Sequence, residues 1–191
     1  MFNLENALIV FALEAESSDL FDAYRVLYTG VGKVQATLSL SLELTKSKPD
    51  LVINMGTAGS RNFKAADIVN PISFVQRDMD ATALGFQAFQ TPFASCPPVL
   101  SYGLRLPSLP QAICGTGDNF SVHEEFGDGL YDVVDMEAYA LASTCKVYDV
   151  PFLCLKYISD GADGEADMDW NSALKDTAQK LKDVLIQNAM L

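Results

Sequence analysis

The sequence predicts an α/β protein in which short buried strands alternate with helices around a central sheet. Short continuous apolar runs, typical of strands covered on both faces, recur along the chain between segments with helical spacing. Several of these runs end in polar or glycine-rich clusters, as strands do at the ligand-binding edge of an α/β sheet. Both observations indicate one layered α/β domain.

The composition limits the classes of partner. The 191 residues, of which 49% are hydrophobic, fit a single domain spanning 1–191 with a substantial core. The net charge of −12 argues against nucleic acid or an anionic membrane as a partner. Because no apolar run approaches the length of a membrane span and the first residues lack signal-peptide features, we expect a cytoplasmic protein.

The cysteines and the single histidine argue against a metal site. The four cysteines show no paired metal-ligand spacing, and Cys114 and Cys154 lie in apolar runs that indicate buried, reduced thiols. His123 is the one histidine, which excludes a His-rich site. We therefore predict no metal and no cofactor.

The first strand is predicted over Ala7 to Ala12 and is followed by Glu14 and Glu16. These carboxylates could face a site, although acidic residues are also common where a helix begins. A glycine-rich turn from Gly30 to Lys33 then leads into a helix that should end near Lys46. Its apolar pattern runs through Ala36, Leu38, Leu40, Leu42 and Leu44.

The next strand, Leu51 to Asn54, runs into a turn of small residues from Met55 to Ser60, where a ligand can approach the backbone closely. Another strand is predicted over Asp67 to Arg77. The segment from Gln90 to Pro110 holds five of the eight prolines, which predicts a surface loop.

In the second half, a short strand from Gln111 to Gly115 leads to Phe120, whose ring could face a ligand or fill the core. A helix is predicted to begin at Asp135 as its cap, with Glu137 in the first turn, where the helix dipole would keep the carboxylate ionised. An amphipathic helix over Asn171 to Ala189 is predicted to close the fold.

The buried strand from Phe152 to Ile158 runs directly into Ser159 and Asp160. Asp160 is a catalytic candidate because chemistry gathers at the carboxyl ends of such strands, although an Asp in this turn could also cap a helix. Four strand-end clusters are expected to meet along one edge of the sheet: Glu14 and Glu16, Gly56 and Thr57, Asp118 and Phe120, and Ser159 and Asp160.

Five ordered motifs resemble the purine nucleoside phosphorylase and nucleosidase superfamily, and most strongly its 5′-methylthioadenosine/S-adenosylhomocysteine nucleosidases. They are the segments 12–16, 30–34, 54–59, 134–138 and 158–163. The resemblance implies a three-layer domain with a central mixed, largely parallel sheet flanked by helices. It also implies a purine nucleoside as the small-molecule partner and an assembly into homodimers, to which Phe86, Phe89 and Phe93 could contribute.

The resemblance further implies a role for each matched residue. Glu16 would activate water, Asp160 would protonate the purine at N7, Glu137 would bind the ribose 2′ and 3′ hydroxyls, and Met136 would pack against the sugar. The other residues expected to contact the substrate are Thr57, Ala58, Gly59, Phe120, Asp135 and Ser159.

The chemistry of N-glycosidic cleavage requires such groups. A purine anion is a poor leaving group, so an acid must protonate the ring while the glycosidic bond stretches. Carboxylates near the sugar stabilise the positive charge that develops there, and one of them can take a proton from the attacking water. Asp160 must be protonated to act, which predicts a raised pKa for this side chain.

Hydrolysis is favoured over phosphorolysis because Asn54 and Met55 stand where the phosphorylases carry a phosphate-binding arginine. Lys33 and Lys156 remain as cations for a phosphate, but Glu16 would repel a dianion. The alternatives are a purine nucleoside phosphorylase, a futalosine-type hydrolase, and a non-catalytic nucleoside-binding or storage protein. Only eleven residues separate Glu16 from Tyr28, so part of the pocket around the 5′ substituent could differ from the family.

Overall fold

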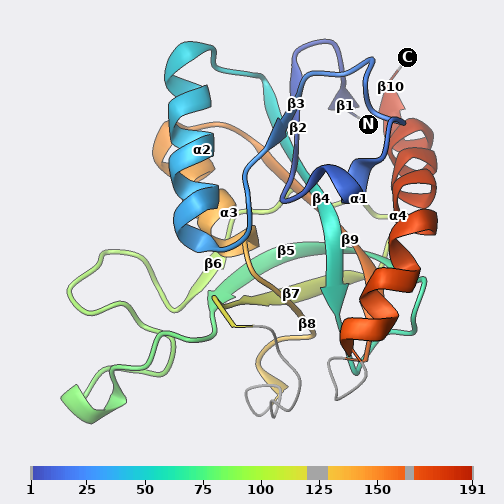
Figure 1. The fold of residues 1–191 in the computed structure, drawn as a ribbon. Coiled ribbons are helices and arrows are strands. Elements are labelled where there is room, and N and C mark those ends of the chain that lie inside the picture. The colour runs from blue at the N-terminus through green and yellow to red at the C-terminus, as the bar shows by residue number, and fades with distance from the viewer. Residues whose placement is uncertain (1, 120–128, 162–165, 191) are drawn as a thin grey trace.

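Eight strands pair into the main sheet of the computed structural model, which describes residues 2–119, 129–161 and 166–190 (Figure 1). They are β2 (Ala7–Phe11), β3 (Val26–Tyr28), β4 (Leu51–Gly59), β5 (Ile68–Gln76), β6 (Val99–Ser101), β7 (Gln111–Thr116), β8 (Val133–Asp135) and β9 (Phe152–Asp160). A separate parallel pair, β1 (Phe2–Asn3) and β10 (Ala189–Met190), brings the two ends of the described chain together. The predicted strands are therefore confirmed, and β4 and β9 extend further than predicted.

The main sheet is mixed and closes on itself. Its strand order is β3-β2-β4-β8-β7-β5-β6, and β9 pairs with both β4 and β5, so that β4, β8, β7, β5 and β9 form a ring. Within this ring the pairs β4/β8 and β5/β9 run antiparallel. Register shifts occur between Ala58 and Gly59 and between Pro71 and Ser73. Because such bulges bend and twist a strand, they help the sheet to close. Closure was not part of the prediction.

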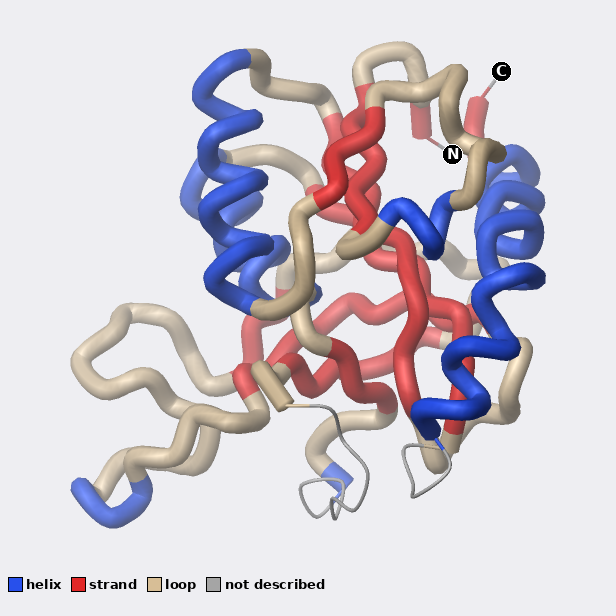
Figure 2. The backbone as a smooth tube through the Cα atoms, viewed as in Figure 1, coloured by secondary structure: helices blue, strands red, loops and turns tan. Residues whose placement is uncertain are grey.

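Helices cover both faces of the sheet (Figures 1 and 2). On one side lie α2 (Lys33–Lys46) and α3 (Ala138–Tyr148), and on the other lie α1 (Glu14–Ser17) and α4 (Ala166–Asn188). The core has a separate cluster on each side, with Leu40 and Leu141 in one and Leu181 and Leu185 in the other. Strand β2 is buried along its whole length, as its continuous apolar run predicts.

Helix α2 carries two apolar rows instead of one. Ala36, Leu40 and Leu44 are four residues apart and are buried, as expected for the core face of a helix. Leu38 and Leu42, which the sequence pattern grouped with them, are exposed, by 55% and 62%. The second row therefore faces away from the core of this chain.

The proline-rich segment is not entirely loop. It contains β6, which pairs antiparallel with β5, and Leu100 and Leu106 are buried. Strand β6 stands at the end of the strand order, where neighbouring prolines do not interrupt a ladder on both sides. The chain before it, which includes the short 3-10 helix η1 (Thr82–Leu84), projects from the body of the protein (Figure 2).

Helix α3 begins at Ala138 and not at Asp135. Val133 to Asp135 pair with β7 as strand β8, so they cannot belong to the helix, and Glu137 occupies the cap position without a side-chain capping bond. Asp135 nevertheless accepts a hydrogen bond from the Ala138 N–H at 2.9 Å. Among the described residues, no helix has the length and apolar character needed to cross a membrane.

Candidate active site

A cavity of about 230 Å³ opens where β2, β4, β8 and β9 end. Its lining includes almost all of the predicted site residues, which come from four separated parts of the chain: Glu16, Thr57, Ala58, Gly59, Asp135, Met136, Glu137, Ser159 and Asp160. Phe120, which was predicted to contact the substrate, and His123 lie outside the described residues. Of the predicted strand-end clusters, Glu14 and Asp118 do not line the cavity and are exposed. The single turn of α1 turns Glu14 outward while it buries Glu16.

Four donors hold the carboxylate of Glu16. Its Oε2 accepts hydrogen bonds from the N–H groups of Ala12 and Leu13, at 3.1 and 3.2 Å. Its Oε1 accepts from the N–H of Thr57 at 3.0 Å and from the Thr57 hydroxyl at 3.2 Å. The carboxylate lies so close to β4 that a Cβ on Gly56 would stand 2.8 Å from Oε1. A side chain at position 56 would therefore displace Glu16.

Asp160 is held at the end of β9 by its neighbour and by β4. The Ser159 hydroxyl lies 2.6 Å from Asp160 Oδ2, and the Asp160 carbonyl accepts a hydrogen bond from the Ser60 N–H at 3.0 Å. Both Ser159 and Asp160 are buried. A short hydroxyl-to-carboxylate bond of this kind orients the carboxyl group toward one side.

Glu137 does not have the ionisation state that the sequence predicted. Its Oε1 accepts a hydrogen bond from the Gly32 N–H at 2.9 Å. Burial, and after it the negative charge of Asp135, raise the pKa of Glu137 to about 8, while Lys156 and the Gly32 N–H oppose this rise. The predicted stabilisation by the helix dipole is outweighed because the side chain is desolvated beside another carboxylate.

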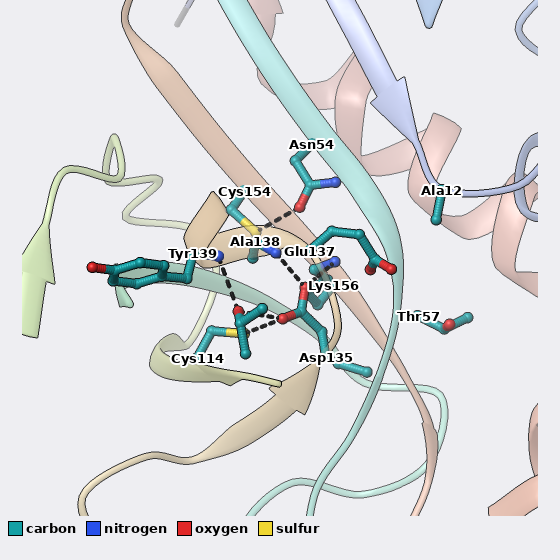
Figure 3. Close-up of polar contacts among 12 residues, drawn as sticks. Ala12, Asn54, Thr57, Cys114, Asp135, Glu137, Ala138, Tyr139, Cys154 and Lys156 are labelled. Atoms are coloured by element: carbon teal, nitrogen blue, oxygen red, sulfur yellow. Dashed lines mark hydrogen bonds and ion pairs between the residues drawn. The ribbon is translucent and has the colours of Figure 1, made fainter. Parts of the chain in front are cut away.

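A buried ion pair lies beside Glu137 (Figure 3). Lys156 on β9 contacts Asp135 Oδ2 at 2.8 Å, and both side chains are almost fully buried. Burial alone would raise the pKa of Asp135, but Lys156 and the hydrogen bonds to the carboxylate lower it below its ordinary value. Asp135 Oδ1 accepts from Thr116 Oγ1 at 2.6 Å and from Cys114 Sγ at 3.3 Å. The Asp135 carboxylate, although it borders the cavity, is therefore committed to contacts within the protein.

Two polar residues of the cavity were not singled out from the sequence. Arg77, at the end of β5, lines the cavity together with Asn119, and its Nη2 donates to the Asn119 carbonyl at 2.5 Å. Gly117 gives the guanidinium room, because a Cβ there would stand 2.8 Å from Arg77 Cζ. Arg77 is a charged residue at the carboxyl end of a predicted strand, so the rule that identified Asp160 could also have found it.

The cysteines are buried as predicted at positions 114 and 154, and the thiols of the four cysteines are free. Burial raises the pKa of the Cys154 thiol to about 12, so this thiol is not a reactive nucleophile. Within the described ranges, no group of three or more His, Cys, Asp or Glu side chains is arranged to hold a metal ion.

Comparison with known proteins identifies the family of the chain. The sequence model of the phosphorylase superfamily matches residues 22–106 and 108–187. A relative from Exiguobacterium sp., the 5′-methylthioadenosine/S-adenosylhomocysteine nucleosidase, is 35% identical over 78% of this chain and 72% of its own length. The chain therefore belongs to the phosphorylase superfamily, and it is an enzyme of the nucleosidase type.

Solved structures show the same fold. A putative 5′-methylthioadenosine/S-adenosylhomocysteine nucleosidase from Francisella philomiragia superposes with a TM-score of 0.85 at 21% identity, covering 95% of this chain and 96% of that one. The futalosine hydrolase of Helicobacter pylori superposes with a TM-score of 0.81 at 23% identity, covering 92% and 93%. The fold is therefore shared by nucleosidases with different substrates.

Proposed function

We propose that the cavity binds a purine nucleoside of the 5′-methylthioadenosine/S-adenosylhomocysteine type and that the enzyme hydrolyses its N-glycosidic bond, releasing adenine. The observation that carries this proposal is the convergence of three carboxyl groups, Glu16, Glu137 and Asp160, on one cavity. The relative from Exiguobacterium sp. with this named activity supports the choice of substrate.

In the proposed mechanism Asp160 is the acid. Protonated Asp160 donates to N7 of the purine as the bond between C1′ and N9 breaks, so that the base leaves in a neutral form. The Ser159 hydroxyl, 2.6 Å from Asp160 Oδ2, holds the carboxyl in position for this transfer. An acid of this kind contributes about 10²–10⁴-fold to the rate.

Glu16 and Glu137 act on the sugar. Glu16 accepts a proton from the water that attacks C1′, and its four hydrogen bonds keep the carboxylate in place without rearrangement during the reaction. Glu137 binds the ribose hydroxyls, and Met136 packs against the ring. Negative charge near C1′ also stabilises the oxocarbenium-like transition state.

A panel of nucleosides tests the proposal. The enzyme is incubated with 5′-methylthioadenosine, S-adenosylhomocysteine, adenosine, inosine and futalosine, each with and without inorganic phosphate. The free base, the free sugar with its 5′ substituent, and the corresponding sugar 1-phosphate are measured. We expect adenine release from the 5′-thio nucleosides without phosphate. A requirement for phosphate would contradict hydrolysis. Release from futalosine alone would contradict the proposed substrate class and leave the chemistry intact.

Replacing Asp160 tests the assignment of the acid. Asp160→Asn removes the transferable proton and keeps the shape, so we expect kcat to fall by about 10²–10⁴-fold. Asp50→Asn makes the same change at an exposed residue that does not line the cavity, and it serves as the matched control. Turnover of every nucleoside at the wild-type rate by Asp160→Asn would show that another group protonates the base.

We further propose a homodimer that uses the exposed row of α2. Val34, Leu38 and Leu42 expose 55–65% of their surface along one side of the helix. An apolar row of this kind on an otherwise acidic protein fits a second copy of the same chain. Phe93 on the projecting segment is 95% exposed and can join this contact, whereas Phe89 packs against Tyr131 within its own chain.

A further inference from the structure

Three charged side chains just outside the cavity form a compact ion cluster. The ammonium of Lys33, the first residue of α2, contacts Asp78 at 2.5 and 2.7 Å and Asp118 at 3.0 Å. The backbone takes part as well. The Lys33 N–H donates to Asp118 Oδ1 at 2.8 Å, and the Asp118 N–H donates to Asp78 Oδ2 at 2.8 Å. The cluster therefore ties together the start of α2 and the turns that follow β5 and β7.

Each member of the cluster lies next in sequence, or nearly so, to a residue of the cavity wall. Asp78 follows Arg77, and Asp118 precedes Asn119, and both of these neighbours line the cavity. Lys33 follows Gly32, whose N–H donates to Glu137. None of the three charged side chains lines the cavity itself. Their effect on the site must therefore act through the backbone segments that they join.

Asp118 connects the ion cluster directly to Gly32, whose N–H donates to Glu137. Gly32 has a φ of +93°, a conformation that other residues rarely adopt, and a Cβ there would stand 3.1 Å from Asp118 Oδ1. Asp118 thus packs against the peptide whose N–H points at Glu137. Contacts to Lys33 and Asp118 also lower the pKa of Asp78 against the effect of its burial, so Asp78 is ionised and the cluster is charged at neutral pH.

We propose that Lys33, Asp78 and Asp118 are positioning residues, which hold the Gly30–Gly32 turn so that the Gly32 N–H donates to the carboxyl group of Glu137. The inference rests on the proposed role of Glu137 in binding the ribose. A variant that lacks the cluster would keep every residue of the cavity wall, but it would lose the hydrogen bond from the Gly32 N–H to Glu137.

Lys33→Met tests the cluster, and Arg25→Met is its matched control. Arg25 forms an ion pair of 2.7 Å with Glu43 toward the far end of the same helix, and both pairs are partly buried, with no side chain more than 30% exposed. Each variant removes the cation from one ion pair that involves a residue of α2. A general loss of stability should therefore appear in both variants. Lys33→Arg, which restores the cation, should recover much of the lost function.

The deciding measurement is the ionisation of Glu137 in the ligand-free enzyme, followed by carbon-13 NMR of its carboxyl carbon. The N–H of Gly32 stabilises the carboxylate, so the pKa of Glu137 should rise in Lys33→Met and stay at the wild-type value in Arg25→Met. The charges that act most strongly on Glu137, namely Asp135, Lys156 and Glu16, are unchanged in both variants. Equal pKa values in the two variants would overturn the proposal.

Kinetics give a second readout. We expect kcat/KM of Lys33→Met to fall by roughly tenfold, because a small displacement of a substrate-positioning group is costly, and Arg25→Met to keep the wild-type value. If Lys33→Met does not fold, Asp118→Asn keeps the side-chain shape while it weakens the ion cluster, and the same two measurements apply. Turnover by the wild type tests the proposed function separately, since the NMR comparison does not depend on it.

Discussion

Glu137 is a buried carboxyl group in the wall of the cavity. The pKa of Glu137 is raised to about 8, whereas that of an ordinary glutamate is 4.5. In the unfolded chain the carboxyl ionises near its ordinary value. Between these two pH values the folded state binds a proton that the unfolded state has lost, so the free energy of unfolding falls as the pH rises.

Glu137→Gln is therefore expected to stabilise the protein at high pH. The substitution removes the buried charge, so its free energy of unfolding should exceed that of the wild type at pH 9 and approach it at pH 5. Urea denaturation at a series of pH values measures the difference. Glu14→Gln, at an exposed glutamate, is the matched control and should show no such trend. A difference that does not change with pH would mean that Glu137 is ionised throughout.

At the scale of elements, the buried ion pair joins two strands of the closed ring. Lys156 lies on β9 and Asp135 ends β8, and these strands both pair with β4. Two charges in the core are costly to desolvate, and their attraction and their hydrogen bonds offset that cost only while both are present. The pair therefore links the two strands that supply Asp160 and Glu137.

We expect Lys156→Met to destabilise the protein by about 3–5 kcal/mol, because it leaves the Asp135 carboxylate buried without its partner. The double variant Asp135→Asn with Lys156→Met should recover part of this loss, since no charge then remains unpaired. Chemical denaturation of the four proteins of this cycle gives the coupling between the two sites. The expectation is wrong if the double variant is no more stable than Lys156→Met.

At the scale of the whole molecule, helix α2 has one buried and one exposed apolar face. One face packs on the sheet, and the other carries the exposed apolar row that we assign to a second copy of the chain. The start of the same helix bears the ion cluster beside the cavity. The proposed dimer contact and the proposed positioning of the Gly30–Gly32 turn therefore involve the same helix.

Leu38→Glu is expected to convert a dimer into a monomer, because it places a charge in the centre of the apolar row. Light scattering after size-exclusion chromatography measures the molar mass in solution. Ile186→Glu makes the same change on α4, at an apolar residue of 43% exposure on the opposite side of the sheet, and should leave the mass unchanged. A wild-type protein that is already monomeric at micromolar concentration would contradict the homodimer.

Much of the fold could be read from local patterns. The continuous apolar runs at β2, β4 and β9 predicted their strands because burial on both faces requires apolar residues at successive positions. The same reasoning located Ser159 and Asp160 at the end of β9. The start of the helix after β8 was placed too early, at Asp135. A helix cap and a short strand look alike in sequence there, and pairing with β7 makes Asp135 the last residue of β8.

The sequence by itself determined the long strands and helices, and its motifs indicated the superfamily and most of the residues around the cavity. Only the tertiary structure decided that the sheet closes and that Asp118 lies outside the wall of the cavity. It also decided the raised pKa of Glu137, which depends on burial and on Asp135. The physical reason is that hydrophobic periodicity acts along the chain, whereas strand pairing, desolvation and charge interactions depend on distances in space between residues far apart in sequence.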